Sequence, residues 1–137
     1  MSNDIIFNKI ETIQRCLRRI DEEFTNEEEF RSNYTKQDSV ILNLERASQA
    51  TIDIGTHLIK VHKYGIPKSS REVFELLHHY DVISKQTLKN MNAMVGFRNI
   101  AVHDYQNLSI DIVIAIVTQH LKDFEMYIEE IIKTTTH

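Results

Sequence analysis

The residues best suited to chemistry lie in one short segment, Arg98-Asn99-Ile100-Ala101-Val102-His103-Asp104-Tyr105. Arginine keeps its charge at physiological pH and grips phosphate oxygens with two parallel N–H donors. Histidine has an ordinary pKa that suits both acid and base catalysis near neutral pH. These two residue types are suited to proton transfer beside a bound phosphate group.

A predicted helix from Lys85 towards Val102, capped by Ser84, must position these two side chains. At ~100° per residue, Arg98 falls in the middle of an apolar arc, where a charge is costly unless it is paired or lies beside a polar cavity. Alternatively, its stem packs and its head reaches water. If the helix continues through His103, the imidazole points ~140° away from Arg98. Either the helix ends before His103 and the chain turns, or the pair acts across two copies.

Hydrophobic residues recur at steps of three and four along most of the chain, which predicts an all-α antiparallel bundle of about five helices. Only three glycines and one proline occur among 137 residues, which also favours long helices. We expect one domain over residues 1–137, and an acidic stretch (Asp21 to Glu23, then Glu27 to Glu29) that is a solvated helix end and loop. Gly65 suits a left-handed cap, and Pro67 prevents continuation of the second helix. The expected helices are 4–24, 37 or 38 to 64, a shorter one opening at 69–72, 85 to about 102, and 110 to about 133.

Composition limits the classes of protein to which the chain can belong. With 42% hydrophobic residues, the chain can build one continuous core. Its net charge of −4 counts against a protein whose main task is to grip a nucleic-acid backbone, but not against an enzyme that touches RNA briefly. The single cysteine cannot form an internal disulfide, and the longest apolar run is too short to span a bilayer. With no signal-peptide pattern either, we expect a cytoplasmic protein that does not enter the membrane.

The remaining histidines and the cysteine give no second site. No zinc-type spacing, glycine-rich phosphate loop or Gly-x-Ser-x-Gly motif is present. His78 and His79 are adjacent, which is poor spacing for two metal ligands on one helix, and Cys16 lies within an amphipathic helix, where we expect it to be inert. We therefore expect no metal site and no cofactor. The histidines interpreted as structural or incidental are His57, His62, His78, His79, His120 and His137.

The Arg98-x4-His103 pattern, with the polar Asn99 directly after the arginine, resembles the signature of HEPN domains, which are all-helical and often ribonucleolytic. The continuation to Tyr105 resembles the Arg-x4-His-x-Tyr form of HepT-like toxins. The resemblance extends over nearly the whole chain in the expected order. It includes the segments 37–44, 65–67, 69–72, 94–103 and 123–124.

This resemblance implies a metal-independent endoribonuclease that acts as the toxin of a two-gene toxin–antitoxin pair. Its antitoxin would be a minimal nucleotidyltransferase, with which the toxin could form a larger hetero-oligomer. In this family that partner neutralises the toxin by attaching AMP to the motif tyrosine, which here would be Tyr105.

RNA cleavage without a metal needs a base for the 2′-hydroxyl, an acid for the leaving 5′-oxygen and positive charge near the phosphorus. Each chain offers one motif histidine, so a two-fold homodimer would supply both proton-transfer groups in one cleft. We expect Arg98 to bind the phosphate and His103 to move protons. Asn99 would orient the phosphate or cap the helix, and Tyr105 would lie at the cleft rim.

Three further residues are weaker candidates for supporting roles. Asp53, on the predicted second helix, could pair with Arg98 or orient His103, or it could be solvated or paired for structural reasons alone. Lys85 and Lys89 could lead RNA to the cleft, or they could belong to an ordinary exposed face.

Alternative functions remain open at this stage. The chain could be a helical dimer that binds RNA or a nucleotide without cutting it, which its net acidity favours. It could be a structural protein whose helices only bind a partner. The pair could also be inverted, with the nucleotidyltransferase as toxin and this chain as its antidote.

Overall fold

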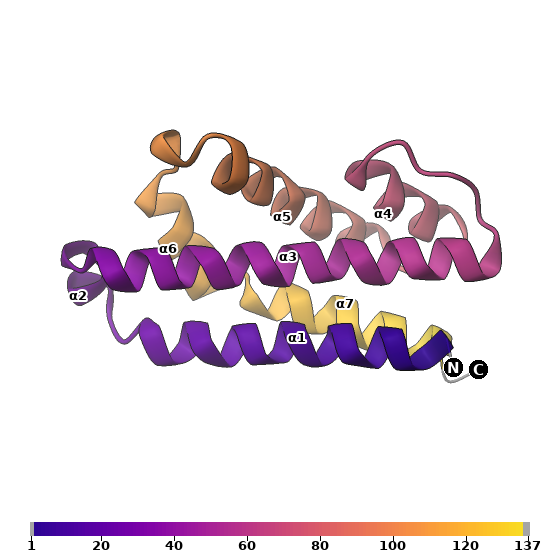
Figure 1. Ribbon diagram of the computed structural model, residues 1–137, viewed down its shortest axis with the longest axis horizontal. Coiled ribbons are helices and arrows are strands. Elements are labelled where there is room, and N and C mark those ends of the chain that lie inside the picture. The colour runs from indigo at the N-terminus through magenta and orange to yellow at the C-terminus, as the bar shows by residue number, and fades with distance from the viewer. Residues whose placement is uncertain (1, 136–137) are drawn as a thin grey trace.

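The computed structural model describes residues 2–135, which form seven α-helices and one 3₁₀ turn with no β-strand among them (Figure 1). This confirms the predicted all-α class. His137, one of the histidines interpreted above, lies outside the described residues. The elements are α1 (Ser2–Glu23), α2 (Glu27–Ser32), α3 (Tyr34–His62), α4 (Ser70–His79), α5 (Lys85–His103), η1 (Tyr105–Asn107), α6 (Ile110–Gln119) and α7 (Leu121–Thr135).

The long helix α3 is the centre of the bundle. Figure 1 shows α3 between α1 and α5, both of which run antiparallel to it. α4 packs against α3 and α5, and α7 contacts α1, α3 and α5. None of the helices in residues 2–135 is long and apolar enough to cross a membrane. The largest fully buried side chains are Ile6, Ile13, Ile20, Phe30, Leu44, Ile54, Ile59, Phe74, Leu77, Met91, Phe124 and Tyr127.

The second part of the acidic stretch, Glu27 to Glu29, is not a loop but the first turn of α2. The side chain of Asn26 accepts a hydrogen bond of 2.8 Å from the backbone N–H of Glu29, which caps the helix. Acidic side chains are favourable at a helix N-terminus because they oppose its positive partial charge. Phe30 is buried and packs on Phe24, with ring centroids 5.0 Å apart. The exposure of Glu27 to Glu29 agrees with the expectation, but the loop was wrong because a helix of six residues is too short to show periodicity.

α3 begins and ends earlier than its pattern predicted. Asn33 accepts a hydrogen bond from the backbone of Lys36 and caps the helix at Tyr34. At the other end the left-handed cap is Lys63, with φ 56°, and not Gly65. Gly65 follows with φ 133°, a value that L side chains rarely adopt, so the glycine serves the connection after the helix.

The predicted fifth helix is divided into α6 and α7 at His120. The φ of −125° at this residue ends α6, and the backbone N–H of His120 still donates to Ile116. Asp123, in the first turn of α7, lies 3.2 Å from the ring nitrogen of His120. No glycine or proline marks the break, so local pattern could not predict it.

α5 carries the motif and is held at both ends. Ser84 caps its start by accepting from Thr87, as predicted. The carboxylate of Glu130 on α7 accepts from the backbone N–H of Ser84 and from the hydroxyl of Thr87. The last turn closes with a 2.8 Å bond from the N–H of Asp104 to Ile100. The helix therefore includes His103, so the alternative in which it ends earlier is wrong.

Candidate active site

His103 is the last residue of a polar row along α5. Because one turn takes 3.6 residues, residues 4, 7, 11, 14 and 18 positions before His103 project within about 40° of it. The side chains in this direction are exposed or half-buried. We call this row the α5 polar stripe, and it consists of Lys85, Lys89, Asn92, Gly96, Asn99 and His103.

Arg98 belongs to the opposite, apolar side of α5, yet its head turns towards the stripe. The residue is half-buried, and its Nε is buried with no hydrogen-bond partner. Its Nη1 donates a 3.2 Å hydrogen bond to the side-chain oxygen of Asn99. The stem therefore packs while the head reaches the surface, which was one of the two interpretations of its position. No ion pair in residues 2–135 includes Arg98, so its charge is available to a phosphate.

His103 is exposed, and its ring has no hydrogen-bond partner among the described residues. It follows Arg98 by five helical residues, which corresponds to about 7.5 Å along the axis and ~140° around it. A single copy thus offers one imidazole, with the guanidinium on a neighbouring face. With this geometry, Arg98 and His103 of one copy point in different directions. This is the case in which we expected the pair to act across two copies.

Asn99 and Asp53 have partners that the sequence did not predict, and only the capping role of Asn99 is contradicted. Asp104, not Asn99, caps the helix end, and Asn99 holds the Arg98 guanidinium instead. The carboxylate of Asp53 forms a 3.0 Å ion pair with Lys9 of α1 and accepts a 2.9 Å hydrogen bond from Gln49. Asp53 thus pairs across α3 and α1, which was one of the interpretations left open for it, and a supporting role at Arg98 or His103 stays a prediction.

Tyr105 opens the η1 turn that follows α5. Its hydroxyl donates a hydrogen bond to the carboxylate of Asp38 on α3, and its side chain is 46% exposed. Partial burial of the hydroxyl, with the hydrogen bond and negative charge of Asp38, raises the pKa of Tyr105 to about 12. The turn is held by Asn107, whose amide donates to Asp104 at 2.9 Å. Tyr105 is therefore both accessible and oriented.

Sequence analysis assigned no functional role to Asp38. It lies 67 positions before Tyr105, and only the packing of η1 on the start of α3 brings the two together. Sequence analysis also did not identify Gly96 as a candidate functional residue. Its position seven residues before His103 already puts both residues on one face of a helix.

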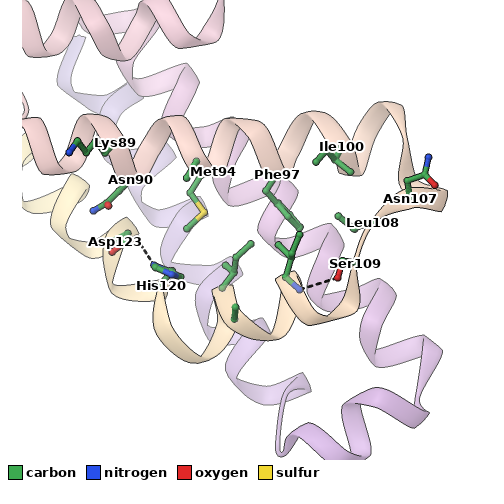
Figure 2. Close-up of a pocket in the computed structure, with 14 residues that line it drawn as sticks. Lys89, Asn90, Met94, Phe97, Ile100, Asn107, Leu108, Ser109, His120 and Asp123 are labelled. Atoms are coloured by element: carbon green, nitrogen blue, oxygen red, sulfur yellow. Dashed lines mark hydrogen bonds and ion pairs between the residues drawn. The ribbon is translucent and has the colours of Figure 1, made fainter.

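An apolar groove of about 370 Å³ runs beside the stripe, between α5 and α6 (Figure 2). Met94, Phe97 and Ile100 of α5 face it in the close-up. His120 and Asp123 lie at one end, and Asn107 and Ser109 at the other. Neither Arg98 nor His103 lines this groove, although Ile100 between them and Lys89 of the stripe do.

Comparison with known proteins identifies the family. The family profile described as "Ribonuclease HepT-like" matches residues 13–131. The chain belongs to this family. It is 50% identical over 129 residues to the mRNA nuclease HepT of Shewanella oneidensis, covering 94% of this chain and 97% of that protein. It is 26% identical over 128 residues to the tRNA nuclease HepT of Aphanizomenon flos-aquae, covering 93% and 87% respectively.

Solved HepT-like structures have the same architecture. A tri-AMPylated HEPN toxin from Shewanella oneidensis, in complex with its MNT antitoxin, is 48% identical and superposes with a TM-score of 0.91, covering 95% of this chain and 98% of that chain. A toxin–antitoxin structure with AMP-PNP, also 48% identical over the same shares, gives a TM-score of 0.92. The cytosolic protein YutE from Bacillus subtilis shares the fold with 12% identity and a TM-score of 0.84, covering 96% of this chain and 89% of YutE.

Proposed function

We propose that this HepT-like chain is the ribonuclease toxin of a toxin–antitoxin pair and that two copies complete its active site. The observation that carries the proposal is the unbroken course of α5 through His103. The Arg98 guanidinium forms no ion pair among the described residues, and it turns towards Asn99 on the polar stripe that ends in His103. One copy supplies one proton-transfer group, and RNA cleavage requires two. A two-fold axis beside the stripe supplies the second.

A dimer of this kind would explain three features of α5: an open glycine and two buried polar atoms without partners. A Cβ added to Gly96 would meet no atom within 4 Å, so nothing within one copy requires a glycine there. Glycine in a helix interior costs about 0.5–1 kcal/mol relative to alanine. Close approach of a second backbone, or of RNA, explains its presence. Asn92 Oδ1 and Arg98 Nε are buried within one copy without partners, and we expect their side chains to turn towards hydrogen-bonding groups of the second copy or of RNA when these approach.

The proposed reaction uses the RNA's own 2′-hydroxyl. His103 of one copy removes the proton of that hydroxyl, and the oxygen attacks the adjacent phosphorus. The bond to the 5′-oxygen breaks, and His103 of the second copy protonates the leaving oxygen. The Arg98 side chains bind the phosphate oxygens and stabilise the charge that develops there. The products are a 2′,3′-cyclic phosphate and a 5′-hydroxyl, and no metal ion takes part.

The proposed substrate is mRNA, which the name of the 50% identical relative gives as its target. Lys85 and Lys89, both exposed on the stripe, provide positive charge along the approach to His103. This local positive charge is present although the chain as a whole has a net charge of −4. We also propose that residues 1–137 act as one cytoplasmic domain.

The proposed partner is a minimal nucleotidyltransferase that silences the toxin by attaching AMP to Tyr105. AMP would add bulk and negative charge close to the site where an RNA phosphate must bind. Purified protein is incubated with the partner and ATP, and its intact mass is measured. No mass gain in AMP steps, or a gain located at another residue, would reject this part of the proposal.

The nuclease itself is tested with purified protein and separate mRNA and tRNA substrates in EDTA. We expect cleavage by the wild type, and loss of at least 100-fold in both Arg98→Ala and His103→Ala. His79→Ala, which changes an exposed histidine of α4, is the matched control and should cleave normally. RNA binding without cleavage would instead indicate a non-catalytic RNA-binding dimer.

A further inference from the structure

The contact between Tyr105 and Asp38 has no place in RNA cleavage as described above. Asp38 is exposed, and the Tyr105 hydroxyl is its hydrogen-bond partner in the described structure. Two cations close to Asp38 in the sequence are engaged elsewhere: Lys36 of α3 pairs with Glu29 at 2.8 Å, and Arg31 of α2 pairs with Asp111. The Asp38 carboxylate is therefore not neutralised by an ion pair and is aimed at the phenol.

A phenol in this position is a weak nucleophile unless a base assists it. With a pKa of about 12, only about one Tyr105 side chain in 10⁵ is ionised at pH 7. Transfer of a nucleotidyl group to the hydroxyl must therefore remove its proton during the reaction. The group that already accepts a hydrogen bond from that hydroxyl is the Asp38 carboxylate.

We propose that Asp38 is the general base for nucleotidyl transfer to Tyr105, so that the toxin supplies a catalytic residue for its own silencing. This inference rests on the proposed function, in which a nucleotidyltransferase presents a nucleoside triphosphate to Tyr105. The phenolic oxygen forms a bond to the α-phosphorus while its proton passes to the Asp38 carboxylate. The bond from the α-phosphorus to the bridging oxygen breaks, and pyrophosphate leaves with that electron pair.

The hydrogen bond also orients the nucleophile. With its proton directed at α3, the Tyr105 oxygen presents its lone pairs away from Asp38, and the 46% exposure of the side chain leaves room for a triphosphate. After transfer Asp38 is protonated and uncharged, so the new phosphate anion does not meet a second negative charge until that proton is lost to solvent.

The test compares Asp38→Asn, Asp38→Glu and Asp104→Asn in the full chain, with the purified partner transferase, Mg²⁺ and ATP. Asparagine keeps an oxygen that accepts the hydrogen bond but cannot take the proton. Asp104→Asn removes a carboxylate next to Tyr105 that does not contact the hydroxyl. It keeps a side-chain oxygen that can accept from Asn107 and so preserve the turn, and it is the matched control. Rates are followed by intact mass from pH 6.5 to 9.5, and helical circular dichroism on heating checks each fold.

We expect Asp38→Asn to lower kcat for AMP transfer about 100- to 1,000-fold at pH 7. The ratio of wild-type to Asp38→Asn rates should fall about tenfold per pH unit, because phenolate formed in solution replaces the missing base, and the ratio cancels the transferase's own pH dependence. Asp38→Glu should recover a large part of the rate, and Asp104→Asn should stay within about twofold of wild type.

Two results would overturn the assignment of Asp38 and leave the toxin proposal intact. One is an Asp38→Asn protein modified at the wild-type rate at every pH, which would place the base on the transferase. The other is a higher KM for the toxin with unchanged kcat, which would make Asp38 a docking residue. A wild-type chain that gains no AMP at Tyr105 would overturn the silencing mechanism and this inference together.

Discussion

Arg98 shows how one side chain can be part of the core and still be free to act. Its backbone position is in the apolar arc, its Nε is buried without a partner, and its Nη1 reaches Asn99. A buried polar atom without a hydrogen bond costs about 1–3 kcal/mol. That cost is typical of functional sites, where a residue is kept for the ligand it will bind and not for stability.

Replacing Arg98 by methionine should separate activity from stability. Arg98→Met keeps a linear apolar stem and removes the unpaired Nε, so we expect a free energy of unfolding within about 1 kcal/mol of wild type, or above it. RNA cleavage should fall at least 100-fold. Urea denaturation and a cleavage assay measure the two quantities. A large loss of stability would show that Arg98 has structural partners.

The raised pKa of Tyr105 predicts a distinct titration of this side chain at alkaline pH. Burial and Asp38 raise the pKa of Tyr105 to about 12, above the ordinary value of 10.0. Between these two values the folded chain holds the proton more tightly than the unfolded chain, so its contribution to stability is complete below pH 10 and is lost as pH rises through 12. The difference in 295 nm absorbance between wild type and Tyr105→Phe gives the titration of this residue. Asp38→Asn should move it towards pH 10, and an unchanged midpoint would contradict the role of Asp38 in the shift.

At the scale of elements, α5 and α3 each contain a glycine within the helix, for different reasons. A Cβ on Gly55 of α3 would lie 2.5 Å from a methyl group of Val73 and 3.1 Å from one of Leu77, so glycine there permits close packing of α4 on α3. A Cβ on Gly96 would meet nothing. The first glycine belongs to the fold, and we assign the second to function.

The two alanine variants should therefore shift stability in opposite directions. Gly55→Ala should lower the free energy of unfolding by about 1–3 kcal/mol, because Val73 must move in a packed core. Gly96→Ala should raise it by about 0.5–1 kcal/mol, because alanine favours the helix. Denaturant titrations at concentrations where each variant is monomeric give both values. Destabilisation by Gly96→Ala in the monomer would mean that this face is not open.

At the scale of the whole molecule, the proposed site exists only when two copies meet. Each copy offers an exposed row that ends in His103, and an apolar groove beside it. A two-fold axis that brings two such rows together places both histidines and both arginines around one phosphate. The net charge of −4 per copy opposes association weakly, so contacts must hold the dimer.

A bulky residue at position 96 tests this assembly. Gly96→Leu should not destabilise the single copy in thermal unfolding, because leucine favours a helix over glycine. It should convert the dimer to monomer in sedimentation and lower RNA cleavage at least 100-fold. Glu75→Leu, on the exposed surface of α4, is the control and should remain dimeric and active. An active Gly96→Leu dimer would show that the two copies do not approach each other at this face, and a monomeric wild-type nuclease would reject the shared site.

The sequence by itself determined the features that depend on near neighbours along the chain. Apolar residues at steps of three and four predicted the long helices, and the capping residue Ser84 marked the start of α5 correctly. The motif segments by which the chain resembles its family are also read from the sequence. The relative direction of Arg98 and His103 follows as well, because helical geometry relates residues five apart without knowledge of the rest of the fold.

Tertiary structure alone decided which distant side chains meet. It paired Asp53 with Lys9 and Tyr105 with Asp38, and it divided the last predicted helix at His120. The physical reason is that periodicity records only which face of a helix is buried. The partner of a polar group depends on the angle and register at which helices pack, and the energies of many contacts set these together.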